Sequence, residues 1–504
     1  MSGRTSTLGA IEARLARENL LAGARRLSAE AAAGIVTDVT ADSRAVGPRS
    51  LFCAVHGTAS DSHRFLPAVA ESGAAGATVE RMNEFAPLPR IHVNNGRLAT
   101  AYAAAEFFGD PWDAMTLVGV TGTNGKTTSA AMLRHLLAAD GPSGYVGTLG
   151  AIGSDGTVIP GTEGLTTPGP VEAARWMRRF ADEGVSRVAM EVSSHALDQG
   201  RLAAVRFDAA VFTNLTQDHL DYHETMEAYR VAKLRLLELV KPTGAAIVNA
   251  DDPAWARVKA TVGRTITFGV DHPADVRAEA VRVGPGGMEF TLRTPDGGAE
   301  VALPIFGTFN VSNAVAAAAV LWSLGWSAAR IAERLGTLPQ VPGRLERTAG
   351  PPECATVLLD YAHTPDALER ALQAVRPLVS GRLIVVFGAG GDRDSAKRPL
   401  MGKAAAENAD LVIVTSDNPR TEDPERIIDD VESGMGSAPR RRISDRREAI
   451  RTALTEGRTD DLVLLAGKGH ETYQIVGTEK RPFDERTVVR EVLADLKTAA
   501  GGAV

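Results

Sequence analysis

Cysteine and long apolar runs are both scarce in this chain of 504 residues. The 2 cysteines, Cys53 and Cys354, lie far apart and offer neither a metal knuckle nor a disulfide framework, as expected for a reducing cytoplasm. No apolar run reaches the ~18 residues that a membrane-spanning helix needs. The segment Met1 to Leu27 has no apolar core or cleavage site of a signal peptide. The sequence therefore predicts a cytoplasmic protein without a membrane span.

An excess of positive charge is also absent. The chain has 55 Lys and Arg against 62 Asp and Glu, a formal net charge of −7, which argues against a nucleic-acid partner. Hydrophobic residues make up 44% and charged residues 23%, a composition typical of folded globular proteins that excludes wholesale disorder. At about 150 residues per domain, this length predicts three domains.

Two breaks in the pattern of apolar segments mark candidate domain boundaries, at 109–111 and at 339–343. They divide the chain into 1–111, a small α/β domain, 112–342, a domain with a largely parallel sheet and helices on both faces, and 343–504, a Rossmann-like α/β domain. A Gly-rich, alternating stretch at 270–293 predicts an antiparallel excursion. Apolar runs predict strands at 51–55, 77–79, 90–93, 115–120, 187–191, 209–212, 245–248, 357–360, 383–387, 411–414 and 462–466.

A Gly-rich loop at Thr121–Thr128 follows one strand and opens a predicted helix at 126–137. In that position, backbone N–H groups, the helix N-terminus and Lys126 can surround nucleotide phosphates, while the Thr127 hydroxyl can bind Mg²⁺. The loop departs from the strict phosphate-loop pattern, since Val120 stands where that pattern has glycine. Glu191 ends another predicted strand and could hold the metal. The plainer alternatives are a turn with an exposed lysine and a solvated glutamate.

Several further segments follow the loop in a fixed order. They are Glu191–His195, Thr213–His219, Tyr229–Lys233, Gly307–Asn313, Gly343–Arg344 and Asp360–Pro365. Over nearly the whole chain this series resembles the Mur ligase family, which adds amino acids to the cell-wall precursor. The resemblance implies three domains, which bind a uridine nucleotide, ATP and the incoming amino acid. It also implies a reaction in which a substrate carboxylate attacks the ATP γ-phosphate and an amine then attacks the resulting acyl phosphate.

The resemblance assigns the catalytic and nucleotide-binding residues. Lys126, Lys233 and His219 are implied to be catalytic, with Lys233 carbamylated by CO₂ to N6-carboxylysine. Thr127, Glu191 and His219 are implied to ligate Mg²⁺. The implied ATP-binding residues are Gly122, Thr123, Asn124, Gly125, Lys126, Thr127, Thr128, Asn310, Arg344 and Asp360. Plainer alternatives are a capped or core histidine for His219 and a surface lysine for Lys233. For Asn310, Arg344 and Asp360 they are a turn asparagine, a surface arginine and a strand-end aspartate.

The resemblance also implies contacts to a UDP-N-acetylmuramoyl dipeptide. The implied residues are Ser43, Thr166, Thr167, Ser193, Gln199 and Arg201, together with the loop Thr58–Ser60, where side-chain and backbone contacts are both open. Arg201 suits this substrate chemically, because the substrate carries carboxylates and a diphosphate. Ordinary turn and cap chemistry is the alternative for the hydroxyl residues.

The segment Asp417–Arg420 resembles that of family members that use diaminopimelate. Diaminopimelate carries a second carboxylate that Arg420 could grip, whereas lysine would leave this guanidinium unpaired. The implied amino-acid contacts are Arg393, Asp417, Asn418, Pro419, Arg420, Gly467 and Glu471. As a bare string of four residues, Asp-Asn-Pro-Arg is a common turn, which is the alternative reading.

The expected activity is therefore the ATP- and Mg²⁺-dependent joining of diaminopimelate to UDP-N-acetylmuramoyl-L-alanyl-D-glutamate by a cytoplasmic monomer with small-molecule partners only. Within the family, another Mur ligase or a folylpolyglutamate synthase is the first alternative. A phosphate-loop kinase or NTPase is another, but it would need no third domain with its own ligand turns. A non-catalytic nucleotide-binding module is the last, and the intact Lys126, Thr127, Glu191, His219 and Lys233 argue against it.

Overall fold

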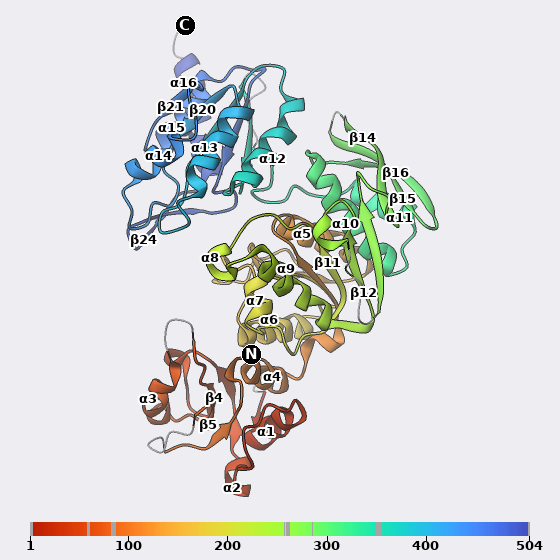
Figure 1. The fold of residues 1–504 in the computed structure, drawn as a ribbon, viewed down its shortest axis with the longest axis vertical. Helices are drawn as coiled ribbons and strands as arrows, with labels where there is room; N and C mark the ends of the chain where they lie inside the picture. Colours follow the sequence, from red (N-terminus) through yellow and green to blue (C-terminus); the bar gives the residue numbers. More distant parts are fainter. Residues whose placement is uncertain are drawn as a thin grey trace. The chain divides into compact units, whose positions relative to one another are not determined.

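The computed structural model describes residues 4–57, 61–81, 87–256, 258, 263–284, 286–348 and 354–501. The chain forms two compact units, Met1–Ile266 and Thr267–Val504, each described here by itself. Both are mixed α/β structures with parallel sheets, as the sequence predicts (Figure 1). The division into domains 1–111, 112–342 and 343–504 stays a prediction, and the loop Thr58–Ser60 lies outside the described residues.

The first unit begins with a parallel sheet whose two faces are both covered. Its strand order is β3 (Asp38–Thr40), β4 (Ser50–Cys53), β5 (Gly76–Val79), β6 (Arg90–His92). Because side chains alternate along a strand, Leu51 and Cys53 pack with α1 (Leu8–Arg17) and α4 (Gly96–Phe108), while Phe52 packs with α3 (Leu66–Glu71). Short elements complete this part: β1 (Ser6–Thr7), α2 (Ala29–Ala32) and β2 (Ile35–Val36).

The larger sheet of the first unit positions the candidate site. In it, β7 (Thr116–Thr121) lies between β10 (Arg187–Glu191) and β11 (Phe207–Phe212), parallel to both. Beyond these lie β8 (Ser143–Gly147) with its antiparallel edge partner β9 (Gly150–Ile152), and β12 (Val240–Asn249) on the other side. The accompanying helices are α5 (Lys126–Leu137), α6 (Pro170–Asp182), α7 (Ser194–Asp198), α8 (Leu220–His223) and α9 (Met226–Leu234).

The second unit opens with the predicted antiparallel excursion. Strands β14 (Val276–Gly284), β15 (Gly287–Thr294) and β16 (Gly297–Leu303) are antiparallel neighbours, and the end of β13 (Arg264–Gly269) pairs parallel with β14. Helices α10 (Thr308–Ser323) and α11 (Ala328–Leu335) lie against these strands. The Ala-rich stretch from Asn313 onward is thus part of a longer helix, which begins at Thr308.

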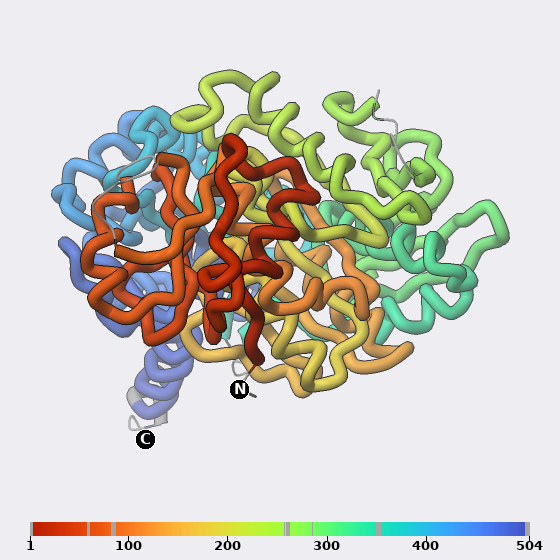
Figure 2. The backbone as a smooth tube through the Cα atoms, turned by 90° about the horizontal axis from the view of Figure 1, so that it is seen from below, coloured from red at the N-terminus to blue at the C-terminus, as the bar shows by residue number. Residues whose placement is uncertain are grey.

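A six-stranded sheet forms the rest of the second unit. The strand order is β17 (Glu346–Arg347), β18 (Thr356–Asp360), β22 (Leu462–Ala466), β19 (Leu383–Phe387), β20 (Leu411–Val414), β21 (Arg440–Arg442), and all are parallel except β17. Helices α12 (Pro365–Val375), α13 (Lys397–Asn408) and α14 (Pro424–Glu432) pack on one face. On the other face lie α15 (Arg446–Glu456) and α16 (Glu485–Gly501), and the latter ends near the C-terminus (Figure 2).

This doubly covered, parallel arrangement brings the turns after β18, β19, β20 and β22 to one edge of the sheet. Ligands of open α/β sheets bind at that edge. A small antiparallel hairpin, β23 (Tyr473–Val476) with β24 (Glu479–Pro482), follows the last of these turns. Among the described helices, none is long and apolar enough to cross a membrane.

Candidate active site

The Gly-rich loop links β7 to α5 in a conformation that only glycine allows at two points. Gly122 has φ 150° and Gly125 has φ 83°. A Cβ atom on Gly122 would lie 1.8 Å from the Thr213 hydroxyl oxygen. Gly119, by contrast, lies inside β7 and leaves room for the Phe207 ring, whose Cε1 would be 2.9 Å from a Cβ there. Gly119 therefore serves packing, and Gly122 and Gly125 shape the loop.

Lys126 is the first residue of α5, and its side chain folds back over the loop. Its Nζ donates to the carbonyl oxygens of Gly122 at 3.0 Å and Thr123 at 2.7 Å. The N-cap residue Gly125 has no side chain to accept from the first-turn amides. A helix N-terminus without a side-chain cap, beside an ammonium group, attracts an anion. The loop is thus a suitable cradle for a polyphosphate.

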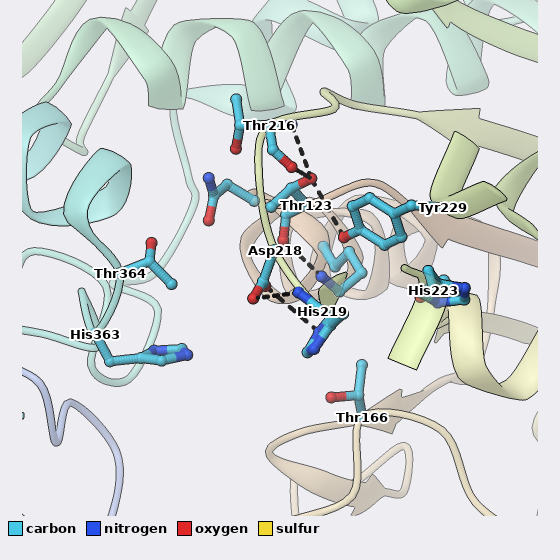
Figure 3. A network of polar contacts seen from close by, with 12 residues as sticks. Thr123, Thr166, Thr216, Asp218, His219, His223, Tyr229, His363 and Thr364 are labelled. Atoms are coloured by element: carbon cyan, nitrogen blue, oxygen red, sulfur yellow. Dashed lines mark hydrogen bonds and ion pairs between the residues drawn. The ribbon is translucent and has the colours of Figure 1, made fainter. Parts of the chain in front are cut away.

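The segment after β11 holds the loop in place. The backbone N–H groups of Thr123 and Asn124 donate to the backbone and side-chain oxygens of Asn214, at 2.7 and 2.9 Å. The Thr123 hydroxyl donates to the Thr216 carbonyl at 3.1 Å and lies 3.3 Å from the Tyr229 hydroxyl (Figure 3). These contacts join the loop to two of the segments on which the family resemblance depends, Thr213–His219 and Tyr229–Lys233.

Glu191 ends β10 next to Val120 of β7, so its carboxylate lies beside the start of the loop. The side chain is fully buried. Its Oε1 accepts from the Tyr145 hydroxyl and, at 3.0 Å, from the Thr148 N–H, while Oε2 accepts from the Thr148 hydroxyl at 3.2 Å. The carboxylate is therefore fixed in position from two sides, and it is not the solvated strand-end residue of the alternative reading.

No group of three or more His, Cys, Asp or Glu side chains in the described part of the chain is arranged to hold a metal ion. Mg²⁺ at nucleotide sites typically takes only one or two protein carboxylates and completes its shell with phosphate oxygens and water. The hydroxyl of Thr127, which is buried in the first turn of α5, and the carboxylate of Glu191 suit that role.

His219 lies in a group of aromatic side chains near the loop. Its ring centroid is 4.8 Å from that of His195 and 6.1 Å from that of Tyr229, and its Nε2 is 3.4 Å from Asp218 Oδ2 (Figure 3). Burial lowers the pKa of His219, with Asp218 opposing that change. A lowered pKa favours the neutral imidazole, which is the form that binds metals.

Lys233 lies on α9 and is 1% exposed. Its Nζ donates to the Gly122 carbonyl at 2.8 Å and lies 4.3 Å from the centre of the Tyr229 ring. Burial lowers the pKa of Lys233 well below its usual value, and the Lys126 ammonium lowers it further. The lowered pKa favours the neutral amine beside the phosphate loop, and the burial rules out the reading as a surface lysine.

Four of the predicted dipeptide-binding residues form one network. The Thr167 hydroxyl donates to the Glu191 carbonyl and accepts from the Ser193 N–H, each at 2.9 Å. Gln199 accepts from Arg201 at 2.7 and 3.0 Å, and Arg201 donates to the Thr167 carbonyl at 3.2 Å. Ser193 also caps α7 by accepting from Ala196 N–H at 3.2 Å, so cap chemistry accounts for part of its role.

The two other predicted dipeptide-binding residues lie outside this network. The Thr166 hydroxyl is 3.5 Å from that of Thr148, a partner of Glu191. Ser43 begins a short 3₁₀ helix, Ser43–Ala45, in the N-terminal part, where Asp42 caps the helix. Within the described residues, no hydrogen bond joins Ser43 to the network.

The predicted nucleotide residues of the second unit are engaged in internal contacts. Asn310 is fully buried and donates to the Phe306 carbonyl at 2.7 Å. Asp360 accepts from the backbone N–H groups of Leu345 at 2.8 Å and Ala362 at 2.9 Å, and burial raises the pKa of its carboxyl. The guanidinium carbon of Arg344 lies 4.9 Å from the centre of the Tyr361 ring. Their ATP contacts stay predictions.

At the edge of the C-terminal sheet, the segment after β20 meets the segment after β22. The Asn418 amide donates to Glu471 Oε2 at 3.0 Å, and Arg420 Nη1 donates to the Gly391 carbonyl at 2.6 Å. Gly467 has φ 112°, a backbone conformation that favours glycine, and a Cβ there would lie 2.9 Å from Asp417 Oδ2. The structure thus brings Asp417–Arg420 and Gly467–Glu471 together, as their predicted shared role requires.

The segment after β19 joins the same edge. Arg393 is exposed and donates to the Asp392 carbonyl at 3.2 Å. The Asp392 carboxylate accepts from the Thr421 N–H at 3.1 Å, which links this segment to the residue that follows Arg420. The buried Arg398 adds a second link, since it donates to Glu422 at 2.8 Å and to the Gly390 carbonyl at 3.3 Å.

Comparison with known proteins agrees with this geometry. The Mur ligase middle domain matches residues 120–321, and the domain described as Mur ligase, glutamate ligase domain matches residues 343–469. The chain is 44% identical over 466 residues to the UDP-N-acetylmuramoyl-L-alanyl-D-glutamate--2,6-diaminopimelate ligase of Gloeobacter violaceus, covering 91% of this chain and 94% of the relative. This chain belongs to the Mur ligase family.

Two further similarities cover as much of this Mur ligase. A relative from Geobacillus thermodenitrificans with the same printed name is 44% identical over 464 residues, which is 90% of this chain and 94% of the relative. A solved structure of a UDP-N-acetylmuramoyl-L-alanyl-D-glutamate--2,6-diaminopimelate ligase superposes with a TM-score of 0.66 at 32% identity, covering 92% of this chain and 95% of its own.

Some residues that shape the Mur ligase site were not identified by sequence reasoning. Tyr145 and Thr148 hold Glu191 across a sequence separation of more than 40 residues, and no local signal marks them. Arg398 has no signal in its own helix either. Lys468 stands between two predicted contact residues, Gly467 and Glu471, and its complete burial is the feature that the sequence did not reveal.

Proposed function

We propose that this Mur ligase joins diaminopimelate to UDP-N-acetylmuramoyl-L-alanyl-D-glutamate in the cytoplasm, with ATP as the energy source and Mg²⁺ as its cofactor, and acts as a monomer. The observation that carries the choice of amino acid is the meeting of Asp417–Arg420 with Gly467–Glu471 at the ligand edge of the C-terminal sheet. The relatives from Gloeobacter and Geobacillus, with their printed names, support the same choice.

The phosphate loop would carry the first half of the reaction. An oxygen of the substrate carboxylate attacks the γ-phosphorus of ATP, and the bond from this phosphorus to the β-phosphate oxygen breaks. ADP departs, and the substrate carboxylate has become an acyl phosphate. Both reactants are anions, so their approach needs positive charge. Lys126 and the N-terminus of α5 supply it. Mg²⁺, which Thr127 and Glu191 would hold, with His219 at a second ion, further offsets the phosphate charge when bound.

Lys233 supports a role for a carbamate in that half-reaction. Its neutral amine can attack CO₂, form an N–C bond and release one proton, which turns a neutral side chain into an anion. Such an anion beside the loop would position a metal-bearing nucleotide. The distance of 2.8 Å from Nζ to the Gly122 carbonyl places it against the loop. The dipeptide would be gripped by Thr166, Thr167, Ser193, Gln199 and Arg201, with Ser43 as a contact to its uridine nucleotide.

In the second half, the neutral amine of diaminopimelate attacks the acyl carbon, an amide bond forms, the carbon–oxygen bond to phosphate breaks with its electron pair on phosphate, and the amine loses one proton, which the leaving phosphate can accept. The ligand edge of the C-terminal sheet offers Arg420 and Arg393 for the distal carboxylate and Glu471 for the distal ammonium. Lysine would leave the guanidinium of Arg420 without its carboxylate partner, and an unmet charge of this kind discriminates strongly between substrates.

Phosphate release by the purified protein tests the proposal. ATP, Mg²⁺ and UDP-N-acetylmuramoyl-L-alanyl-D-glutamate are supplied, and meso-diaminopimelate, LL-diaminopimelate, lysine or no amino acid is added. We expect release that depends on one diaminopimelate isomer, with a tripeptide product identified by mass. Release with lysine alone would retain the ligase and refute the choice of amino acid. Release that needs no amino acid would indicate an NTPase.

Replacing Arg420 with alanine is expected to raise the KM for diaminopimelate about a hundredfold, because a charge-assisted bidentate contact is lost. The KM values for ATP and the uridine nucleotide should stay nearly unchanged. Initial rates at varied amino-acid concentration measure this. Arg426→Ala, an exposed arginine on α14, is the matched control. An unchanged KM for diaminopimelate in Arg420→Ala would refute the specificity assignment.

A further inference from the structure

Lys468 is a fully buried cation at the centre of the predicted amino-acid site. Its side chain has 0% exposure, although a lysine is rarely buried without a partner. Its Nζ lies 3.4 Å from Asp417 Oδ1, 3.2 Å from Asn418 Oδ1 and 3.2 Å from Glu471 Oε2. All three partners are residues predicted to contact the amino acid, whereas Lys468 is not among those predictions. Its ammonium therefore lies between the segments Asp417–Arg420 and Gly467–Glu471.

The contacts of Lys468 are selective between the two oxygens of Glu471. Oε2 receives both the Lys468 ammonium and, at 3.0 Å, the Asn418 amide. Among the described residues, no hydrogen bond reaches Oε1. Glu471 is the more exposed of the two carboxylates, with 14% of its side chain exposed against 6% for Asp417. One oxygen of Glu471 is thus held from the protein side and the other stays available to a ligand.

The local charge leads to the same conclusion. Asp417 and Glu471 contribute two negative charges and Lys468 one positive charge, so these three side chains together carry one negative charge in excess. The distal centre of diaminopimelate carries one ammonium next to one carboxylate. A single ammonium on Glu471 would complete the charge balance, and Arg420 remains for the carboxylate. Without Lys468, the two unneutralised carboxylates would instead draw the substrate ammonium inward, into the place of the lysine. The substrate would then no longer have its distal carboxylate at Arg420.

We propose that Lys468 is a positioning residue for amino-acid selection: its ammonium occupies the inner cation position between Asp417 and Glu471, so that the substrate ammonium binds only at the outer oxygen of Glu471, in register with Arg420. This inference rests on the proposed function. It adds that diaminopimelate is distinguished from lysine by the distance between two charge positions, which Lys468 sets, as well as by the presence of Arg420.

The test uses the full-length enzyme and three variants. Lys468→Met keeps the length of the side chain and removes the charge. Asp417→Asn/Lys468→Met removes one charge of each sign and so restores the balance of the cluster. Lys403→Met is the control, because Lys403 on α13 is 62% exposed and is not among the predicted contacts. KM and kcat are measured for ATP, for the uridine nucleotide, for the diaminopimelate isomer that the wild type uses, and for lysine.

For Lys468→Met we expect a KM for diaminopimelate raised at least about tenfold, KM values for the two nucleotides within about twofold of the wild type, and a smaller preference over lysine. The double variant should have a KM for diaminopimelate between those of Lys468→Met and the wild type. Such a recovery is not expected if Lys468 is needed only for folding. An unchanged diaminopimelate KM, an equal loss for all substrates, or no recovery in the double variant would overturn the proposal.

Thermal melting accompanies the kinetics, since a lost buried ion pair destabilises a protein. If Lys468→Met does not fold, the double variant decides: a KM for diaminopimelate within tenfold of the wild type supports the proposal, and a larger rise or a failure to fold overturns it. A wild type without any diaminopimelate-dependent phosphate release would refute the proposed function itself. A normal wild type with an unaffected Lys468→Met would refute only the role of Lys468.

Discussion

Replacing Lys233 with alanine is expected to lower kcat about a hundredfold, while the protein still folds and binds its nucleotide substrates. The reason is the combination of complete burial, a lowered pKa and a contact of 2.8 Å to the Gly122 carbonyl. That environment disfavours the ammonium form of Lys233, which suits an amine that takes up a carboxyl group. A carbamate restores a charge, and it is negative.

The rescue experiment separates the carbamate from a packing role. Lys233→Ala leaves a space beside the loop into which formate or acetate can enter, whereas Lys233→Met fills that space with an uncharged side chain. We therefore expect small carboxylates to recover part of the activity of Lys233→Ala and none of that of Lys233→Met. The wild type should lose activity in CO₂-depleted buffer and regain it with bicarbonate. A Lys233→Ala enzyme with an unchanged rate would argue against the carbamate.

The direction of the pKa shift also fixes how this carbamate should respond to pH. Burial and the Lys126 ammonium lower the pKa of Lys233, which raises the share of the reactive neutral amine at any given pH. Acidification reverses carbamylation, because it protonates the Lys233 amine, and only the neutral amine can react with CO₂ to form the carbamate. Activity that depends on dissolved CO₂ should consequently be lost as the pH falls and return when it is raised again.

Strands buried on both faces are the elements that the sequence predicts best. The apolar runs at 187–191, 383–387, 411–414 and 462–466 coincide with β10, β19, β20 and β22, and the glycines before Lys126 mark where α5 begins. These signals are local and strong. The edge strand β21 is the opposite case, since its three arginines are all exposed and its pairing depends on a neighbouring strand. The hairpin of β23 and β24 has the same weakness, with an exposed, charged second strand.

The residues of the candidate site also differ in how well the sequence predicts them. The loop, Glu191 and Asp417–Arg420 stand at strand ends, where a parallel sheet concentrates ligand contacts, so the sequence identifies them. The partners that hold these residues come from elsewhere in the chain. Tyr145 and Thr148 reach Glu191 from the strand β8 and the turn after it, and Lys468 reaches Asp417 from the turn after β22, which β19 separates from β20. Only the folded chain reveals such pairings.

Lys126→Ala is the second substitution with a large expected effect, a fall in kcat of about a thousandfold. The Lys126 Nζ lies against the loop, 2.7 Å from the Thr123 carbonyl oxygen. In the reaction it has to offset the repulsion between an attacking carboxylate and a polyphosphate, and this repulsion is greatest at the transition state. The loss should therefore fall mainly on kcat, with a smaller rise in the KM for ATP.

The effects of Lys126→Ala on kcat and on the KM for ATP distinguish a role of the charge in the reaction from a structural role. Alanine removes the contacts to Gly122 and Thr123 as well as the charge, so a loosened loop alone would raise the KM for ATP and leave kcat closer to the wild type. Lys126→Arg keeps a positive charge in a longer, planar group and should retain more kcat than alanine does. Lys403→Ala, on the exposed face of α13, controls for the loss of one lysine. If Lys126→Ala kept most of its kcat, the charge that brings the two anions together would have to come from another group.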